Sequence, residues 1–277
     1  MARVPVNGLH FNVEAEGEGA PLLLLHGFTG SAAGWAPQIE AFAGRARIVA
    51  VDLLGHGRSD APADPRRYRI ERAGEDIVGV LDRLGLRRTT VLGYSMGGRL
   101  GMWLATAAPD RVGALILDSA SPGLRDPAQR RAREVDDARL ATTIERDGIA
   151  AFVAHWERLS MFATQAGLPE AVRRSVRAQR LQHTAIGLAN SLRGMGQGVQ
   201  PPLHDRLPQL RIPTLLIAGA FDPAYCAHAR EMSTLIPGAR LAIVPDAGHA
   251  VHLEQPDAFC RLVLDFLDEV TAGHAVR

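Results

Sequence analysis

The string "GYSMG" at residues 93–97 sets Ser95 between two glycines, and it is a stretch that could do chemistry. A serine hydroxyl is weakly reactive unless a neighbouring group takes its proton. Glycines on either side favour a tight, strained turn, in which a neighbouring Cβ would clash. Because a strand-like run precedes the string and a helix-like run follows it, the pattern predicts a nucleophile elbow, a sharp strand-turn-helix that exposes the serine.

Asp222 and His249 are the partners that a reactive serine would need. Asp222 follows the apolar run "TLLIAGA", and His249 follows "LAIVPDAG". The histidine would accept the hydroxyl proton, while the carboxylate would fix its tautomer and stabilise the imidazolium. Asp118 also ends a strand-like run and is a rival acid. We favour Asp222 because its loop, "GAFDPAY", directly precedes the unit that carries His249.

The string "HGFTGS" at residues 26–31 could supply an oxyanion hole. It follows the apolar run "LLLL", and its turn can aim the backbone N–H of Phe28 into the site. The N–H of Met96, at the start of the predicted helix, would be the second donor. Three further histidines in or near these motifs are interpreted as loop supports rather than chemical groups: His26, His56 and His252.

The segments that must position these residues alternate between buried strands and helices. The chain opens with a predicted hairpin, "RVPV" and "LHFNVEA" about the turn Asn7-Gly8. Continuous apolar runs typical of buried parallel strands follow, in "LLLLHG", "RIVAVDLLGHG", "TTVLGYS", "ALILDSAS", "PTLLIAGAFD" and "RLAIVPDAGH". Helices are predicted around 71–84, from 96 to about 107 and from about 257 to 270. This order predicts an α/β fold with a mostly parallel central sheet flanked by helices.

The alternation stops between about 122 and 206, where helical periodicity and charge replace strand-like runs. We interpret residues 122–206 as a helical lid inserted after the sixth strand, and residues 1–121 and 207–277 as the core. Ligands of such sheets bind beyond the carboxyl ends of the strands. The lid is therefore expected to cover the active site.

Composition excludes several classes of partner. The 277 residues carry 31 basic and 30 acidic side chains, a net charge of +1, which gives no general field for nucleic acid or a membrane surface. Apolar runs are too short to span a bilayer, and the N-terminal stretch lacks a signal-peptide pattern. Cys226 and Cys260 match no metal or redox spacing. We expect a soluble, cytoplasmic protein.

Arg99 lies four residues after Ser95, so on a helix the two share a face. The ordinary interpretation is a solvated surface residue. The helix is apolar almost throughout ("LGMWLATAA"), however, which predicts burial against the sheet. A buried, unpaired guanidinium is costly, so Arg99 should have an anionic partner. That partner is either a protein carboxylate or a substrate.

Together, "HGFTGS", "DLLGHGRSD", "GYSMGG", "FDP" and "GHAVHLEQP" resemble the α/β-hydrolase superfamily across nearly the whole chain. The order serine, acid, histidine is typical of that fold. The resemblance does not settle the reaction, because the superfamily includes esterases, lactonases, C–C hydrolases and lyases.

A narrower resemblance runs through the lid, in "SASPGLRDPAQRRAREVDD", "WERLSMFATQ" and "QRLQHTAIGLANSLRGMGQG". With "GYSMGGR", these strings are similar to the 2-succinyl-6-hydroxy-2,4-cyclohexadiene-1-carboxylate synthases of menaquinone biosynthesis. The resemblance implies a lyase that eliminates pyruvate, with Ser95 as the activated base and with no metal or organic cofactor. The N–H groups of Phe28 and Met96 would then stabilise charge on the succinyl carbonyl oxygen.

The substrate implied by this resemblance is a small tricarboxylate, and planar guanidinium groups bind carboxylates at two points. The family's substrate-binding residues correspond here to Tyr94, Arg99, Arg133, Trp156 and Arg180. Arg130 and Arg131 lie close to Arg133 and are alternatives to it. From spacing alone, a lid arginine is as well explained by a solvated helix surface.

Two rival functions share the core motifs. A carboxylesterase or C–C hydrolase would use the same three catalytic residues with water, and would not need three converging arginines. A receptor-like binding protein would keep the fold without the reaction. Release of pyruvate separates the lyase from both.

Overall fold

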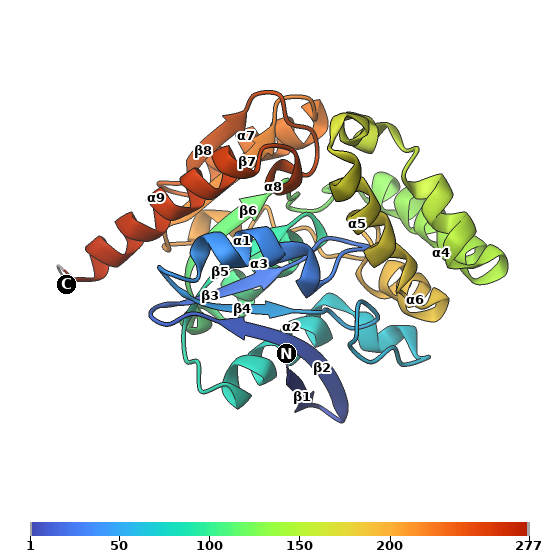
Figure 1. Cartoon of the computed structure of the whole chain (residues 1–277), viewed down its shortest axis with the longest axis horizontal. Helices are drawn as coiled ribbons and strands as arrows, with labels where there is room; N and C mark the ends of the chain where they lie inside the picture. The colour runs from blue at the N-terminus through green and yellow to red at the C-terminus, as the bar shows by residue number, and fades with distance from the viewer. Residues whose placement is uncertain (1, 276–277) are drawn as a thin grey trace.

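An eight-stranded sheet forms the centre of the protein in the computed structural model, which describes residues 2–275 (Figure 1). Its strands are β1 Ala2–Val6, β2 Leu9–Glu16, β3 Pro21–Leu25, β4 Arg47–Val51, β5 Thr89–Tyr94, β6 Val112–Asp118, β7 Thr214–Gly219 and β8 Arg240–Val244. The spatial order is β1-β2-β4-β3-β5-β6-β7-β8. From β4 to β8 every neighbouring pair is parallel. The predicted mostly parallel sheet is confirmed.

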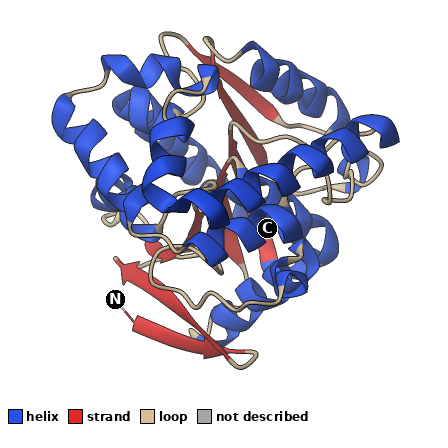
Figure 2. Ribbon diagram, turned by 90° about the vertical axis from the view of Figure 1, so that its right-hand side faces the viewer, coloured by secondary structure: helices blue, strands red, loops and turns tan. Residues whose placement is uncertain are grey.

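The antiparallel edge of the sheet is the predicted N-terminal hairpin. β1 pairs with β2, and β2 continues antiparallel to β4. The connecting residues Asn7 and Gly8 both have positive φ, 50° and 78°. Two such residues form the turn whose twist matches that of paired strands, which is why Asn-Gly predicted it. The hairpin projects at the lower left of Figure 2.

Helices cover both faces of the sheet (Figure 2). The core packs α2, α3 and α7 against one face and α1 and α9 against the other. Their bounds are α1 Ala36–Phe42, α2 Ile70–Arg83, α3 Met96–Ala107, α7 Pro223–Leu235, the short α8 Val251–Glu254 and α9 Pro256–Ala275. Because both faces are covered, the strands read as continuous apolar runs rather than alternating ones. The last helix extends beyond its predicted end near 270, to Ala275.

Between β6 and β7 the chain forms a helical lid: α4 Pro127–Trp156, the 3₁₀ segment η4 Ser160–Gly167, α5 Glu170–Leu181 and α6 Ala185–Met195. The helix α4 is broken at Gly148, whose φ of 80° is not helical. The lid has its own apolar core between α4 and α6, formed by Ala141, Ile144, Phe152, Val153, Leu188, Ala189 and Leu192. The three lid helices lie together at the right of Figure 1.

The carboxyl ends of the parallel strands bring the candidate residues together. Ser95 follows β5, Asp118 ends β6, Asp222 lies three residues beyond β7, and His249 follows β8. Since all these strands are parallel, their carboxyl ends share one edge of the sheet.

Candidate active site

Ser95 stands on a strained turn between β5 and α3. Its φ is 49° and its ψ is −107°, a conformation that non-glycine residues rarely adopt. Its backbone N–H donates to the carbonyl of Asp118 at 2.8 Å, which fixes the turn to the neighbouring strand. A Cβ at Gly93 would lie 2.4 Å from the Gly97 oxygen, and one at Gly97 would lie 2.1 Å from the Leu25 oxygen. The elbow therefore tolerates only glycine at both positions.

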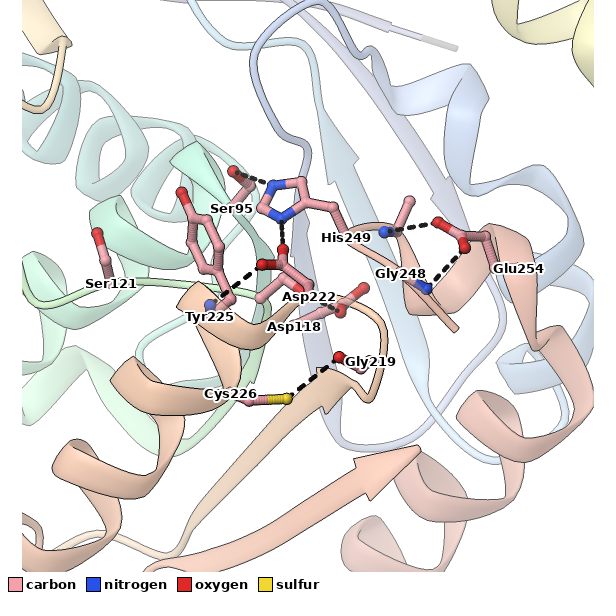
Figure 3. Close-up of polar contacts among 12 residues, drawn as sticks. Ser95, Asp118, Ser121, Gly219, Asp222, Tyr225, Cys226, Gly248, His249 and Glu254 are labelled. Carbon is pink, nitrogen blue, oxygen red and sulfur yellow. Dashed lines mark hydrogen bonds and ion pairs between the residues drawn. The ribbon is translucent and has the colours of Figure 1, made fainter. Parts of the chain in front are cut away.

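His249 connects Ser95 to Asp222 (Figure 3). Its Nε2 lies 3.1 Å from Ser95 Oγ, and its Nδ1 lies 2.8 Å from Asp222 Oδ2. The carboxylate can only accept, so Nδ1 carries the proton and Nε2 is free to accept the serine proton. Asp222 is itself held by the N–H of Tyr225, which donates to Oδ1 at 3.2 Å. The three side chains form a hydrogen-bonded relay that can make Ser95 a base or a nucleophile.

The rival acid, Asp118, is engaged elsewhere. Its Oδ2 accepts from His252 Nδ1 at 2.7 Å, and its side chain is fully buried. The structure therefore brings Asp222, and not Asp118, to His249. His252 in turn supports the loop, as expected, since its backbone carbonyl accepts from Gln38 at 2.8 Å.

Glu254 holds the loop that carries His249 in place, and it was not predicted from the sequence. Its carboxylate accepts from the N–H of Gly248 at 2.7 Å and from that of Ala250 at 3.1 Å, on either side of His249 (Figure 3). The acceptor contacts only main chain, so no partner side chain could mark it in the sequence.

Two backbone N–H groups are available beside Ser95. Met96 is the first residue of α3, and Phe28 lies in the turn after β3. Both residues line the same cavity as Ser95. Neither N–H has a hydrogen-bond acceptor within the described part of the chain. The positive end of the α3 dipole adds to their ability to stabilise an anion.

The cavity in front of Ser95 has a volume of about 340 Å³. Its wall includes most of the predicted site residues: Phe28, Tyr94, Ser95, Met96, Arg99, Arg133, Trp156, Asp222 and His249. It also includes residues that the sequence did not single out, among them Gln197, Tyr225 and His228.

Arg99 is buried, with 7% of its surface exposed. Its guanidinium donates to the Met195 carbonyl at 2.9 Å and to Gln200 Oε1 at 2.5 Å. Among residues 2–275 no carboxylate lies within ion-pair distance of it. Burial lowers the pKa of Arg99 to about 10, so the group is still a cation at neutral pH. A protein carboxylate is therefore not its anionic partner.

Arg133 is the one of three neighbouring lid arginines that faces the cavity. Its Nε donates to Asp137 at 2.8 Å and its NH1 to Gln197 at 3.0 Å. Arg130 instead donates to the backbone carbonyls of Leu124 and Arg125, while Arg131 is exposed on the helix.

Arg180 does not line the cavity of Ser95. It lines two adjoining cavities, of about 260 Å³ and about 650 Å³. Its guanidinium sits 5.2 Å from the ring centre of Phe162, and its contacts to Gln165 and Glu157 are long, 3.4 and 3.5 Å. Phe162 and Tyr94 line both the smaller of these two cavities and the cavity of Ser95. Burial lowers the pKa of Arg180. The three predicted arginines thus face neighbouring cavities, all of which have Phe162 in their walls.

Aromatic side chains close the cavity from the lid and from α7. The Trp156 ring lies 5.3 Å from that of Phe28, and its Nε1 is buried without a partner in the part of the chain that the structure describes. Tyr225 was not predicted from the sequence, and its ring centre lies 4.3 Å from that of His249. Burial raises the pKa of Tyr225, so its hydroxyl stays protonated and can donate. Its place three residues after Asp222 was the available signal.

The histidines expected to support loops do so. His26 Nε2 accepts from the N–H of Leu53 at 3.0 Å, and its Nδ1 donates to the Gly27 carbonyl at 2.8 Å. Burial lowers the pKa of His26 to about 4 and holds that of His56 well below its ordinary value. In the described residues no cluster of histidine, cysteine and carboxylate side chains is placed to hold a metal, and both cysteines are free thiols.

Comparisons with known proteins find similarity along most of the chain. The family model for the alpha/beta hydrolase fold matches residues 20–256. The chain is 42% identical over 266 residues to the "Putative 2-succinyl-6-hydroxy-2,4-cyclohexadiene-1-carboxylate synthase" of Bacillus subtilis (strain 168), covering 95% of this chain and 97% of that protein. It is 31% identical to the 2-succinyl-6-hydroxy-2,4-cyclohexadiene-1-carboxylate synthase of Serratia proteamaculans (strain 568), covering 89% and 92%. The solved structure of MenH from S. aureus superimposes with a TM-score of 0.90 at 31% identity, covering 95% of this chain and 99% of that one.

Proposed function

This chain belongs to the α/β-hydrolase family and, within it, to the 2-succinyl-6-hydroxy-2,4-cyclohexadiene-1-carboxylate synthases, and from that membership we infer the reaction it catalyses. It eliminates pyruvate from 2-succinyl-5-enolpyruvyl-6-hydroxy-3-cyclohexene-1-carboxylate and leaves 2-succinyl-6-hydroxy-2,4-cyclohexadiene-1-carboxylate, a step of menaquinone biosynthesis. The protein is therefore a carbon–oxygen lyase on a fold that also carries hydrolases.

The structural observation that supports this inference is the burial of the charged Arg99 side chain without a carboxylate partner among the described residues. A buried cation stands in the wall of the cavity that holds Ser95, and the described residues offer it no carboxylate. Arg133 adds a second guanidinium to the same wall. Such a cavity favours a substrate that brings its own negative charge, which a neutral ester does not.

We propose that Ser95 acts as a base in this reaction. His249 would take the proton from Ser95 Oγ as that oxygen removes the ring proton next to the succinyl carbonyl, with Asp222 stabilising the imidazolium. The electron pair of the broken C–H bond would form a ring double bond between C2 and C3. The pair of the existing C3–C4 double bond would then shift to C4–C5 and expel the enolpyruvyl oxygen from C5. The leaving enolate then takes up a proton and becomes pyruvate. No bond to Ser95 forms.

The backbone N–H groups of Phe28 and Met96 supply the electrostatic part of the proposal. Removing a proton next to a carbonyl places negative charge on the carbonyl oxygen. Both N–H groups line the cavity without another acceptor, so they can donate to that oxygen as the charge develops.

Arg99, Arg133 and Arg180 are proposed to bind the carboxylates of the substrate, with Tyr94 and Trp156 shaping the space between them. Because Arg180 faces the adjoining cavities, one carboxylate would lie beyond Phe162 and Tyr94. None of the described helices is long and apolar enough to cross a membrane. We also propose a cytoplasmic location, which the two free thiols support because reducing compartments keep cysteines unpaired.

The test of the function is the release of pyruvate from the enolpyruvyl substrate, followed with lactate dehydrogenase and NADH. The purified protein should release one pyruvate for each substrate consumed. A protein that hydrolyses neutral esters and releases no pyruvate would instead be a carboxylesterase, and one that does neither would be a binding protein.

A further inference from the structure

Three buried histidines pack together beside the turn that carries Phe28, and the mechanism above uses none of them. The ring centres of His26 and His56 are 5.0 Å apart, and those of His56 and His183 are 5.3 Å apart. His26 precedes the turn, His56 lies in the loop after β4, and His183 lies in the lid between α5 and α6. The cluster therefore lies where the lid meets the turn at residues 27–30, which is called the oxyanion turn below.

His183 makes two hydrogen bonds that define its tautomer. The N–H of Gly57 donates to its Nδ1 at 3.0 Å, and its Nε2 lies 2.8 Å from the carbonyl oxygen of Thr29. Since a carbonyl only accepts, Nε2 must carry the hydrogen and Nδ1 must not. His183 therefore bridges two core loops as a neutral ring, from a position in the lid.

The surroundings of His183 keep the ring neutral. Burial is the largest cause and lowers its pKa, and the nearby Arg180 acts in the same direction. The hydrogen bond to Thr29 and the charge of Asp52 oppose them, but the net shift is downward. His26 and His56 share the cluster and are uncharged for the same reason, burial. A second proton on His183 would set Nδ1–H against the N–H of Gly57, so only the neutral ring can make both contacts.

The turn that His183 contacts is strained. Thr29 has a φ of 66°, in the left-handed region that β-branched residues seldom enter. Such a conformation persists only where neighbouring contacts hold it. The hydrogen bond from His183 to the Thr29 carbonyl is one of those contacts.

The same turn sets the direction of the Phe28 N–H. The Gly27 carbonyl and the Phe28 N–H belong to one planar peptide group, so fixing the carbonyl fixes the N–H. His26 donates to that carbonyl at 2.8 Å, and Gly30 donates to it at 3.0 Å. His183 donates to the carbonyl of Thr29, two residues further along the chain. Phe28 therefore stands between two carbonyls that each accept from a histidine.

We propose that His183 is a positioning residue, through which the seated lid holds the Phe28 N–H in the direction that stabilises the reacting oxygen. Closing the lid and completing the oxyanion hole would then be one event. The proposal rests on the function inferred above for Phe28. It assigns no contact between His183 and the substrate.

Two neutral variants separate the two hydrogen bonds of His183. In His183→Gln the amide nitrogen can reach the position of Nε2 and donate to Thr29, but the acceptor for Gly57 is lost. In His183→Asn the amide oxygen can replace Nδ1 as the acceptor for Gly57, but the side chain is too short to reach Thr29. Removing an oxyanion donor lowers kcat by about 10²- to 10³-fold, and a misdirected donor should lose less. We expect His183→Asn to lower kcat by roughly 10- to 100-fold with KM little changed, and His183→Gln to stay within about threefold of wild type.

Steady-state kinetics of pyruvate release and the melting temperature are measured for both variants. A purely structural role would lower the melting temperature and leave kcat of the folded enzyme unchanged, or would affect both variants equally; either result overturns the proposal. His183→Ser, which is also too short for Thr29, replaces the asparagine variant if that variant does not fold, and must show the same loss of kcat.

Failure of this proposal can be told from failure of the proposed function. If the wild-type protein releases no pyruvate but hydrolyses a p-nitrophenyl ester, the lyase assignment fails while the comparison of His183→Asn with His183→Gln can still be made on the ester. Acyl transfer also develops charge on a carbonyl oxygen, so the same difference in kcat is required there. Equal kcat values for the two variants, on the substrate that the enzyme uses, would overturn the proposal that His183 positions the Phe28 N–H.

Discussion

Ser95, His249 and Asp222 should act as a unit, because each hydrogen bond of the relay depends on the next. Ser95→Ala and His249→Ala should each lower kcat for pyruvate release by about 10³- to 10⁶-fold, and the double variant should be no slower than the single ones. Circular dichroism checks that each variant is folded. A Ser95→Ala enzyme with near-wild-type release would remove the serine from the mechanism.

The choice of acid can be tested with a matched pair. Asp222→Asn should slow the reaction strongly, since an amide next to His249 favours the wrong tautomer. Asp118→Asn is its control, because Asp118 is buried and bonded to a histidine in the same way but contacts His252. Rates of pyruvate release rank the two. If Asp118→Asn is the slower enzyme, the assignment of the acid is wrong.

Arg99 should matter for the substrate more than for the fold. A charge-assisted hydrogen bond contributes about 1.5 to 3 kcal/mol, so Arg99→Ala should lower kcat/KM by roughly tenfold to over a hundredfold. Arg99→Lys should recover only part of this loss, because an ammonium group cannot make the planar two-point contact. Hydrolysis of a neutral ester, if any, should be almost unchanged.

The contrary result for Arg99 is equally specific. In that case Arg99 only stabilises the fold, through its hydrogen bonds to the Met195 carbonyl and to Gln200. Arg99→Ala would then lower the melting temperature sharply and leave kcat/KM of the folded enzyme as it was. The cavity would in that case offer no argument for an anionic substrate beyond family membership.

The sequence could predict those site residues whose neighbours in the chain also determine where they lie in the fold. Ser95 follows from its glycines, because only glycine fits the elbow, and Asp222 and His249 follow from the strands that precede them. Glu254 and His183 could not be predicted in this way. Their partners are backbone groups, and a backbone N–H or carbonyl leaves no mark on the sequence.

At the scale of elements, helix α4 offers an internal comparison between two arginines. Both side chains are exposed, but Arg133 lines the cavity of Ser95 and Arg131 does not. Arg133→Gln should raise KM for the tricarboxylate by about tenfold, and less if its partial exposure and its pair with Asp137 weaken the contact. Arg131→Gln removes the same charge and should leave KM within about twofold. Equal effects would mean that α4 contributes only general positive charge.

The elements of the core were more predictable than the seating of the lid. Strands such as β3 and β5 are buried on both faces, so their apolar runs identify them directly. Helical periodicity in the lid shows which face is apolar but not what that face docks against. Arg180 is an example: its place on α5 could be predicted, but its contact with the ring of Phe162 from η4 and the cavities that it lines could not.

At the scale of the whole molecule, one of the contacts between the lid and the core is made by groups that must be uncharged. The fold closes over the site by burying His26, His56 and His183 where lid, oxyanion turn and the loop after β4 converge. Each of these rings donates to, or lies against, a backbone carbonyl at that junction. Acid should therefore weaken the molecule at the place where its two parts join.

The pKa of His26 predicts in which direction acid changes the stability of the fold and over which pH range. The pKa of His26 is about 4 in the folded chain, below the ordinary value of 6.5, so between these values the unfolded chain binds more protons than the folded one. The free energy of unfolding should therefore be unaffected by His26 above about pH 6.5 and fall as the pH is lowered towards 4, by roughly 3 kcal/mol at most.

Urea unfolding at pH 7, 5.5 and 4.5 measures this dependence of the free energy of unfolding on pH. His26→Gln should be less stable at pH 7 but lose less on acidification, so that the two curves converge towards pH 4.5. If the curve of His26→Gln instead runs parallel to that of wild type, the buried histidine does not control the acid stability of the fold.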